Sequence, residues 1–403
     1  MKAVIMAGGK GTRIRSIESD LPKPMVKIAG KPVLEYQLLI LSRYGIKNII
    51  IVVGYLGNSI KDFFGNGEKY GIQIEYIVED IPLGSAGALF FLKDIIQEDF
   101  LLINGDIIFD IDIQRLYAFH KNKKAMVTLL THPNDHPFDS KLVVTNSGGR
   151  VVELVNNIKL EQQTEIKNRV NAGIHVFSPD IFQFFTRKEK KNMDEDVLQN
   201  IIKQYPVYAY DSPEYAKDMG TPKRFFQVQN DINMGIVKKR NLAQKQKAVF
   251  FDRDGTINKY KGYITDSKQM ELAEGIGDLI NKIHSKGYLV IVITNQPVIA
   301  RGECTKKELE KIHNRMEWLL AREEAYVDAI YYCPHHPDKG FKGEITKYKK
   351  KCYCRKPNPG MLYQAACDYN IDLKQSYMIG DSKIDIEAGR RAGCKCILVD
   401  TAL

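Results

Sequence analysis

Two short apolar runs in this chain each end in residues suited to binding phosphate groups. Residues 7–25 read AGGKGTRIRSIESDLPKPM and follow the apolar run 2–6, whereas residues 249–258 read VFFDRDGTIN and place two aspartates directly after an apolar stretch. A short hydrophobic strand that ends in Gly or Asp presents its ligand at the carboxyl edge of an open α/β sheet. The sequence therefore predicts an α/β protein with two phosphate-handling sites in series.

The length and the hydrophobic pattern indicate two domains. At 403 residues the chain has room for about two to three domains of roughly 150 residues each. β-branched apolar runs alternate with amphipathic stretches in both halves, which predicts βαβ units and mostly parallel sheets. The clearest predicted strands are residues 2–6, 49–53, 74–78 and 100–103 in the first half, and 248–251, 289–293 and 377–379 in the second.

The boundary between the two halves is expected near Gln244, because residues 233–247 are rich in Lys, Arg, Gln and Asn. We expect an N-terminal Rossmann-like domain over residues 1–232, the end of a helix and a linker over 233–246, and a second Rossmann-like α/β domain over 247–403.

Composition and charge narrow the class of partner. The net charge of +10 comes from lysines without an aromatic-interleaved recognition element, so nucleotides and sugar phosphates explain it better than a nucleic acid does. No charged-then-apolar leader precedes the glycine-rich loop, and no apolar run approaches the ~18 residues of a membrane span. We expect a cytoplasmic protein without a membrane or nucleic-acid partner. The sequence leaves open whether it forms a homo-oligomer.

The glycine-rich loop after the first apolar run suits a nucleoside triphosphate. Gly8, Gly9 and Gly11 let backbone N–H groups approach phosphate oxygens, because no Cβ stands in the way. Arg13 and Lys23 follow at intervals from which both can reach a triphosphate. The loop lacks the Gly-Lys-Ser or Gly-Lys-Thr ending of a P-loop and the third-glycine spacing of a dinucleotide fingerprint. A glycine turn without a ligand is the alternative.

The motifs AGGKGTR and LPKPM resemble the sugar-phosphate nucleotidyltransferases, which join a nucleoside triphosphate to a sugar 1-phosphate and release pyrophosphate. The resemblance covers about residues 1–232 and extends to the segments EDIPLGSAGAL, NGDIIFD, NAGIHVF and DMGTPKRF. It implies that Asp106 and Asp218 hold Mg²⁺ between them. It further implies that Arg13 stabilises the leaving pyrophosphate and Lys23 the α-phosphate. The residues implied to contact the nucleotide or the sugar are Gly84, Gly87, Asn171, Gly173 and Glu195.

One departure from that family lies near residue 151. Relatives commonly carry Glu-Lys-Pro there, whereas this chain has Glu153 without an adjacent lysine. Lys159 is a candidate substitute for the contact to the sugar phosphate, and an ordinary surface lysine is the alternative. Asp110 and Asp112, close to the first metal aspartate, are expected to lie in a solvated loop.

The second motif places Asp252 and Asp254 on either side of Arg253. Two carboxylates at a strand end converge on one metal ion and one phosphate if the chain turns there, and Gly255 permits that turn. DRDGT resembles the haloacid dehalogenase superfamily of phosphatases, whose further elements follow in order as ITNQ, CRKPNPGM and GDSKID. Aspartates that only form turns are the alternative, which we keep for Asp385.

This second resemblance implies a role for each motif. Asp252 attacks phosphorus as the nucleophile, and Asp254 protonates the leaving alcohol and then activates water. Mg²⁺ is held by Asp252, Asp381 and the backbone carbonyl of Asp254. The residues expected at the phosphoryl group and the substrate are Thr294, Asn295 and Lys356.

The cysteines indicate a metal site rather than a disulfide framework, because there are seven, none occurs before Cys304, and the others cluster. CPHH and CYC supply a Cys-x-His pair and a Cys-x-Cys pair, which together make a closed tetrahedral Zn²⁺ site. Such an ion orders a loop that has little apolar content of its own. His336 is a competing ligand. The four expected ligands are Cys333, His335, Cys352 and Cys354.

The second resemblance is more specific for the heptose bisphosphate phosphatases and the related histidinol phosphatases. It covers about residues 247–401 and includes TNQPVIARG, the cysteine-rich loop and CRKPNPGM. Relatives usually have Ser-Gly where this chain has Pro297 and Val298. The resemblance implies that Arg355, with Arg301, binds the second phosphate of the sugar.

Together the two resemblances imply a bifunctional enzyme. Removal of the 7-phosphate from D-glycero-D-manno-heptose 1,7-bisphosphate yields a heptose 1-phosphate, which is the kind of acceptor that the first domain would activate. The first domain resembles the D-glycero-α-D-manno-heptose 1-phosphate guanylyltransferases, which favours GTP and a GDP-heptose product. The alternative is a nucleotidyltransferase for mannose or an N-acetylhexosamine with another nucleoside triphosphate, fused to a histidinol-phosphatase-like or non-catalytic regulatory module.

Overall fold

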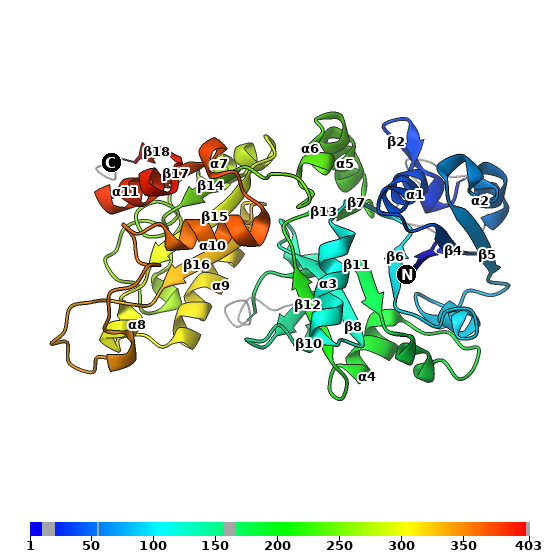
Figure 1. The fold of residues 1–403 in the computed structure, drawn as a ribbon, viewed down its shortest axis with the longest axis horizontal. Helices are drawn as coiled ribbons and strands as arrows, with labels where there is room; N and C mark the ends of the chain where they lie inside the picture. The colour runs from blue at the N-terminus through cyan, green and yellow to red at the C-terminus, as the bar shows by residue number, and fades with distance from the viewer. Residues whose placement is uncertain (10–20, 55, 157–165, 400–403) are drawn as a thin grey trace. The chain divides into compact units, whose positions relative to one another are not determined.

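The computed structural model describes residues 1–9, 21–54, 56–156 and 166–399, which form two compact units (Figure 1). Unit 1 comprises residues 1–132, 143–155 and 171–241, and unit 2 comprises residues 133–142, 156–170 and 242–403. Both units are mixed α/β structures, as the sequence predicts.

A nine-stranded sheet forms the centre of unit 1. Its interior strand β1 pairs in parallel with β4 and β6, and β11 runs antiparallel to β6. Alternate residues of β1 enter different cores: Ala3 and Ile5 pack on one face, and Val4 packs on the other. A strand that buries both faces reads as a continuous apolar run, which is why the sequence revealed these strands. The strands are β1 (Lys2–Met6), β4 (Asn48–Val53), β5 (Gln73–Val78), β6 (Phe100–Asn104), β8 (Val127–His132), β9 (Leu142–Thr145), β10 (Val151–Val155), β11 (Val170–Phe177) and β12 (Val207–Asp211).

Two short antiparallel ladders and six helices complete the regular structure described in unit 1. The ladders pair β2 (Lys27–Ile28) with β3 (Lys31–Pro32), and β7 (Ile107–Asp110) with β13 (Tyr215–Asp218). The helices are α1 (Val33–Arg43), α2 (Gly57–Phe64), α3 (Ile113–Lys123), α4 (Gln199–Ile201), α5 (Pro222–Asn233) and α6 (Ile236–Lys239).

The expectation that Asp110 and Asp112 lie in a solvated loop is wrong. Asp110 is 3% exposed, and its carboxylate forms an ion pair with Arg43 and accepts a hydrogen bond from Asn241 at 2.6 Å. Asp112 caps α3 by accepting hydrogen bonds from backbone N–H groups of the first turn. Both carboxylates can be buried because hydrogen bonds or an ion pair offset the free-energy cost of removing each charge from water.

The segment expected to link the halves contains more structure than its composition suggests. It includes helix α6, and both Asn241 and Leu242 are 2% exposed. Unit 1 ends at Asn241 and the last part of unit 2 begins at Leu242.

A five-stranded parallel sheet forms the centre of unit 2, in the order β16-β15-β14-β17-β18. The middle strand β14 again feeds two cores, with Val249 and Phe251 on one face and Ala248 and Phe250 on the other. The strands are β14 (Ala248–Phe251), β15 (Leu289–Asn295), β16 (Ala329–Cys333), β17 (Tyr377–Gly380) and β18 (Lys395–Leu398). The helices are α7 (Ile276–His284), α8 (Val298–Arg301), α9 (Lys306–Arg322), α10 (Gly360–Tyr369) and α11 (Lys383–Ala392).

Helix α9 of unit 2 packs against residues that come far earlier in the chain. Arg169 Nη1 lies 2.9 Å from Glu317 Oε1, and the two residues are 4% and 1% exposed. The indole N–H of Trp318 donates to the carbonyl oxygen of Ile166 at 2.7 Å. Part of the interior of unit 2 therefore consists of residues that precede the range 247–403 in the chain.

Replacing Arg169 by alanine is expected to destabilise unit 2 by about 3–5 kcal/mol, because the Glu317 carboxylate is left buried without its cation. Urea unfolding followed by the fluorescence of Trp318, the single tryptophan of the chain, measures this change. The matched control is Arg187→Ala, which removes an ion pair to Glu189 at a side chain that is 79% exposed, and a small effect is expected there. A loss below about 1 kcal/mol for Arg169→Ala would contradict the prediction.

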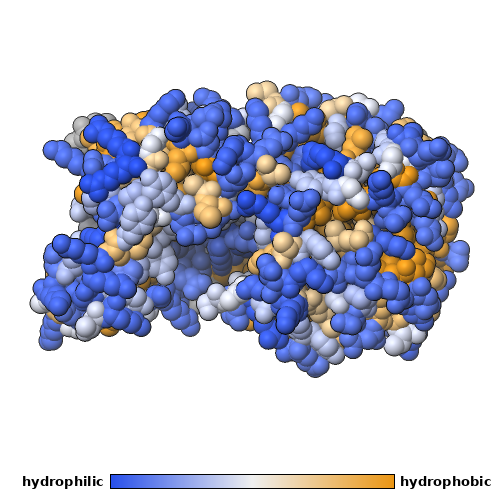
Figure 2. Space-filling model, in the orientation of Figure 1, coloured by the Kyte–Doolittle hydropathy of each residue, from blue (hydrophilic) through white to orange (hydrophobic). Residues whose placement is uncertain are grey.

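The described residues contain no helix with the length and apolar character that a bilayer span requires. On the face drawn in Figure 2, hydrophilic side chains cover most of the surface, and hydrophobic residues gather in small groups between them.

Candidate active sites and metal centre

The glycine-rich loop of unit 1 begins where β1 ends, and the N–H of Ala7 still donates to Val52 of the neighbouring strand at 2.8 Å. A Cβ on Gly8 would lie 2.3 Å from Glu79 Oε2, so a larger residue there would require this carboxylate to move. Burial raises the pKa of Glu79, against the opposing effect of the Leu83 N–H. Gly9 is exposed. Gly11, Arg13 and Lys159 lie outside the described residues.

The structure brings Lys23, Asp106 and Asp218 together. Lys23 Nζ forms an ion pair with Asp106 Oδ2. In the ladder of β7 and β13, Asp218 lies opposite Ile107, the residue after Asp106. Burial favours the neutral form of Asp218, but Arg224, the Gly220 N–H and Lys23 outweigh it, so that its pKa is lowered. Ionised carboxylate oxygens are the ligands that Mg²⁺ prefers, and the Asp106 and Asp218 side chains therefore fit such an ion.

Of the residues expected at the sugar and the base, Asn171 and Gly173 contact each other. Asn171 on β11 donates to Asp194 Oδ1 and accepts from the Gly173 N–H, both at 3.1 Å. Glu195, which is predicted to contact sugar hydroxyls, is exposed in the π-helix Met193–Leu198, and its neighbour Asp194 makes the contact to Asn171. Nothing in the sequence distinguished these two adjacent acids. Gly84 and Gly87 lie against the backbone carbonyl groups of Lys191 and Glu189.

The second site lies at the carboxyl ends of three neighbouring parallel strands. Asp252 follows β14, Thr294 and Asn295 end β15, and Asp381 follows β17. Lys356 comes from the loop before α10, and its Nζ lies 2.6 Å from Asp252 Oδ1. Two hydrogen bonds of 3.0 Å between Asn295 and the Lys356 backbone fix this loop. The ordered set of motifs therefore converges as predicted.

Asp385 joins this group, although the sequence suggested only a turn former. It is 0% exposed and its Oδ1 lies 2.6 Å from Lys356 Nζ, while its Oδ2 accepts from the Ser382 N–H in a capping box of α11. The spacing of Ser382 and Asp385 was a signal for its position, because a capping box places the second residue in the first turn of the helix.

The carboxylates of Asp252, Asp381 and Asp385 offer oxygens that all lie within 4.8 Å of one another. Burial raises the pKa of Asp252 to about 6, although Lys356 opposes the shift. Burial likewise opposes the charge of Lys356, but the two flanking carboxylates outweigh it and raise its pKa. A Cβ on Gly255 would lie 2.0 Å from Asp381 Oδ2, so only glycine allows this approach. Three hard oxygen donors beside one ammonium group fit Mg²⁺.

The carboxylates of Asp254 and Asp252 have different hydrogen-bond partners. Arg253 Nη2 donates to both oxygens, and Gln296 Nε2 donates to Oδ2 at 2.9 Å. The amide of Gln296 also donates to Thr294 Oγ1 at 2.9 Å. The sequence did not single out Gln296 or assign a role to Arg253.

The two arginines expected at the second phosphate are held in different ways. Arg355 donates to the carbonyl oxygen of His335 at 3.0 Å. The Arg301 guanidinium lies 4.5 Å from the ring centre of Tyr263 and 4.4 Å from that of Phe341. The electron-rich faces of both aromatic rings attract the positive charge of the guanidinium group.

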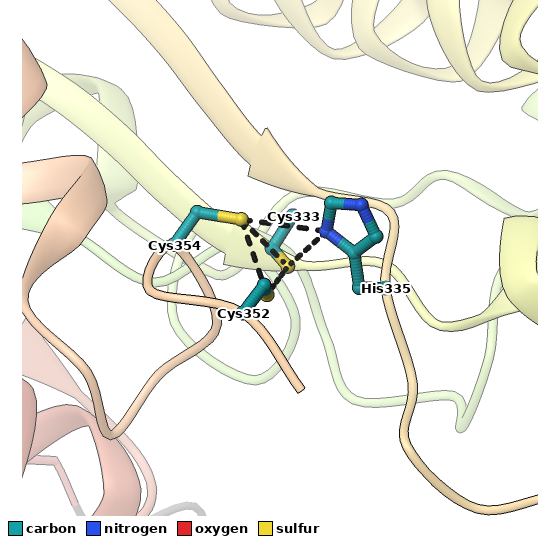
Figure 3. A group of neighbouring side chains, drawn as sticks. All are labelled: Cys333, His335, Cys352 and Cys354. Carbon is teal, nitrogen blue, oxygen red and sulfur yellow. Dashed lines mark hydrogen bonds between the residues drawn. The ribbon is translucent and has the colours of Figure 1, made fainter. Parts of the chain in front are cut away.

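The four predicted zinc ligands meet at one point (Figure 3). The sulfur atoms of Cys333, Cys352 and Cys354 lie 3.2–3.4 Å from one another, and His335 Nδ1 lies 3.5 Å from Cys354 Sγ. These separations are far longer than a disulfide bond and suit donors facing a common centre. His336 is not part of the group, and its Nδ1 accepts from the Asp338 N–H instead. The chemistry of the donor set fits Zn²⁺.

Comparison with known proteins agrees with this geometry. The family model described as nucleotidyl transferase matches residues 2–235, which is more than half of the chain. The chain belongs to the nucleotidyl transferase family. The haloacid dehalogenase hydrolase-like family model matches residues 353–402.

Two relatives and one solved structure cover the two parts of this nucleotidyl transferase. D-glycero-beta-D-manno-heptose-1,7-bisphosphate 7-phosphatase of Salmonella typhi is 41% identical over 151 residues, which are 38% of this chain and 78% of the relative. D-glycero-alpha-D-manno-heptose 1-phosphate guanylyltransferase of Aneurinibacillus thermoaerophilus is 32% identical over 233 residues, 58% of this chain and 98% of the relative. HddC of Yersinia pseudotuberculosis is 24% identical with a TM-score of 0.51, covers 57% of this chain and 99% of its own, and supports the fold alone.

The C-terminal part of the nucleotidyl transferase therefore belongs to the haloacid dehalogenase-like phosphatases, since a relative more than 30% identical is covered over most of its length. The chain is an enzyme with a nucleotidyltransferase part and a phosphatase part.

Proposed function

We propose that this enzyme carries out two consecutive steps of nucleotide-activated heptose synthesis. Unit 2 removes the 7-phosphate of D-glycero-D-manno-heptose 1,7-bisphosphate, and unit 1 transfers GMP from GTP to the resulting heptose 1-phosphate. The products are orthophosphate, pyrophosphate and GDP-heptose. The observation that carries the proposal is the presence, in one chain, of two groups of candidate site residues, in parts whose relatives are named for consecutive steps on a heptose phosphate.

The anomer follows from the order of the steps. Hydrolysis at C7 breaks no bond to the anomeric carbon, so the configuration at C1 passes unchanged to the second site. The phosphatase relative is named for the β anomer and the transferase relative for the α anomer. For both sites to act in series on one molecule, the phosphatase of this chain has to accept the α anomer, and we include this in the proposal.

In the phosphatase, Asp252 Oδ1 attacks phosphorus, the bond from phosphorus to the C7 oxygen breaks, and Asp254 gives its proton to that oxygen. Water then attacks the phosphoryl-aspartate, Asp254 takes the water proton, and the bond to Asp252 breaks to release orthophosphate. Lys356 Nζ, 2.6 Å from Asp252, stabilises charge on the phosphoryl oxygens. Asp252, Asp381 and the backbone carbonyl of Asp254 would hold Mg²⁺, with the Asp385 carboxylate close by, and the ion would supply further neutralisation of negative charge.

In the transferase, the sugar phosphate oxygen attacks the α-phosphorus of GTP and pyrophosphate leaves, without a covalent enzyme intermediate. Lys23 neutralises the α-phosphate and Arg13 the pyrophosphate, so the chain acts through positioning and charge. Asp106 and Asp218 would hold Mg²⁺, which would supply neutralisation of the negative charge of the triphosphate. A Zn²⁺ ion on the four-ligand cluster of unit 2 has a structural role in the proposal.

Phosphorus NMR of the protein with each anomer of the heptose bisphosphate, Mg²⁺ and GTP tests the whole proposal. Orthophosphate, pyrophosphate and a GDP-sugar are expected together with the α anomer. Orthophosphate without pyrophosphate would contradict the assignment of GTP or of the heptose 1-phosphate as a substrate of unit 1. Turnover of the β anomer alone would contradict the proposal that both sites use the α anomer. No reaction with either anomer would contradict the heptose assignment.

Replacing Asp218 by asparagine is expected to lower nucleotidyl transfer by at least about 10²-fold and to leave phosphate release unchanged, because the variant loses a metal-binding charge. Coupled assays for pyrophosphate and orthophosphate measure the two activities separately. The control is Asp62→Asn, which removes an exposed carboxylate from α2. An unchanged transferase rate would contradict the assignment of Asp218 as a metal ligand.

A further inference from the structure

The side chain between the two catalytic aspartates is completely buried. Arg253 is 0% exposed and is among the largest fully buried side chains of the described residues. Its backbone carbonyl accepts hydrogen bonds from the N–H groups of Ile257 and Asn258, so the loop folds around it. A buried guanidinium needs hydrogen-bond acceptors at its N–H groups, because an unpaired charge is costly to remove from water.

Those acceptors are Asp254 on one side and His313 on the other. Arg253 Nε lies 3.1 Å from Asp254 Oδ1, and Nη2 lies 2.9 and 2.8 Å from the two carboxylate oxygens. Nη1 lies 3.3 Å from Nε2 of His313 on α9. Because a guanidinium donates and cannot accept, the facing ring nitrogen of His313 has to be the acceptor of a neutral imidazole. Burial, with the charge of Arg253, holds the pKa of His313 well below its usual value, which agrees with this.

Gln296 completes the enclosure of the Asp254 carboxylate. Its amide donates to Asp254 Oδ2 at 2.9 Å, and the residue is 1% exposed. Both carboxylate oxygens therefore have fixed donors on the protein side. The Asp254 side chain keeps 18% of its surface exposed, which leaves a face open for substrate and water.

We propose that Arg253, anchored by His313, is a positioning residue that orients the carboxylate of Asp254 for both proton transfers of the phosphatase. The inference rests on the proposed phosphatase function of unit 2. His313 acts one step further away, by fixing the far end of the guanidinium. Neither residue touches the substrate.

The two chemical steps depend on this orientation to different extents. Breaking the bond to an alkoxide such as the sugar C7 oxygen requires proton donation by Asp254, whereas p-nitrophenolate leaves readily without it. Hydrolysis of the phosphoryl-aspartate requires Asp254 as a base whatever the first leaving group was. Misorientation of Asp254 therefore slows both steps with an alkyl phosphate but only the second step with an aryl phosphate.

The test variant is Arg253→Met, which keeps an unbranched apolar stem and removes the guanidinium donors. With a sugar phosphate, kcat is expected to fall about 10²-fold with little change in KM. With p-nitrophenyl phosphate, rapid-mixing experiments are expected to show a burst of nitrophenolate near the enzyme concentration, larger than that of the unmodified protein, followed by slow turnover. The inference would be overturned if the burst amplitude and the steady-state rate fell by the same factor. It would also be overturned if neither of them fell.

A pair of His313 variants keeps the inference testable if Arg253→Met fails to fold. His313→Gln retains an acceptor for the guanidinium and is expected to keep most of the activity, whereas His313→Leu removes it and should show the burst pattern. Lys307→Gln, on an exposed part of the same helix, is the control. The same loss in the Gln and Leu variants would indicate only helix packing and would overturn the role of His313.

Failure of the inference and failure of the proposed function give different results. If the unmodified protein hydrolyses p-nitrophenyl phosphate but not the heptose bisphosphate, the sugar is wrong, and the comparison continues with glycerol phosphate as the alkyl substrate. If it hydrolyses no phosphate ester, the phosphatase function fails and the inference fails with it.

Discussion

Replacing Asp252 by asparagine is expected to reduce phosphatase turnover by about 10⁴-fold or more, because the variant loses the atom that forms the bond to phosphorus. An amide oxygen at the same place is a poor nucleophile, and Asp385, which also lies 2.6 Å from Lys356 Nζ, comes from α11 and not from the end of β14. Release of orthophosphate from the bisphosphate, followed over hours, measures the residual rate.

The same variant should retain the fold and the other activity. Lys356 keeps its ion pair with Asp385, so the buried ammonium group is not left without a carboxylate. Nucleotidyl transfer from GTP to a supplied heptose 1-phosphate is expected to proceed at the unmodified rate. A phosphatase loss smaller than about tenfold would contradict the assignment of Asp252 as nucleophile. Parallel loss of both activities would contradict the independence of the two sites.

Removing zinc is expected to abolish phosphatase activity as well. Structural zinc in small domains contributes on the order of 10 kcal/mol to folding, and the cluster fixes the loop that delivers Lys356 to Asp252. Arg355 and Lys356 directly follow the ligand Cys354, and Arg355 donates to His335, another ligand. Loss of the ion therefore displaces the residues that bind the phosphoryl group.

Cys354→Ser provides the cleanest form of this experiment. We expect zinc content, measured by mass spectrometry, to fall from about one ion per chain to nearly none, the Trp318 unfolding midpoint to drop, and nucleotidyl transfer to persist. Cys367→Ser is the control, because that cysteine is exposed and lies outside the cluster. Full activity in zinc-free protein would show that the four-ligand group has no structural role in catalysis.

The order of the chain's motifs was sufficient to predict much of the fold. The strands β1, β4, β6 and β14 lie where continuous apolar runs predicted them, since strands buried on both faces cannot tolerate polar residues. The expectation of mostly parallel sheets is correct for the second half, whereas the first sheet also contains β11 antiparallel to β6. That pairing follows from the way β11 returns to the sheet, which the hydrophobic period does not encode.

Local sequence by itself determined the two glycine- and aspartate-containing loops, the parallel core strands and the set of four zinc ligands, because each of these depends on residue types at fixed short spacings. Tertiary structure alone decided that Asp194 contacts Asn171 and that Asp385 shares Lys356 with Asp252. It also decided that Arg169 is buried against Glu317 in unit 2. These choices depend on contacts between residues far apart in the chain, such as Lys356 and Asp252, which are separated by 104 positions. Burial and charge select the partners in such contacts, and neither can be read from the spacing of a motif.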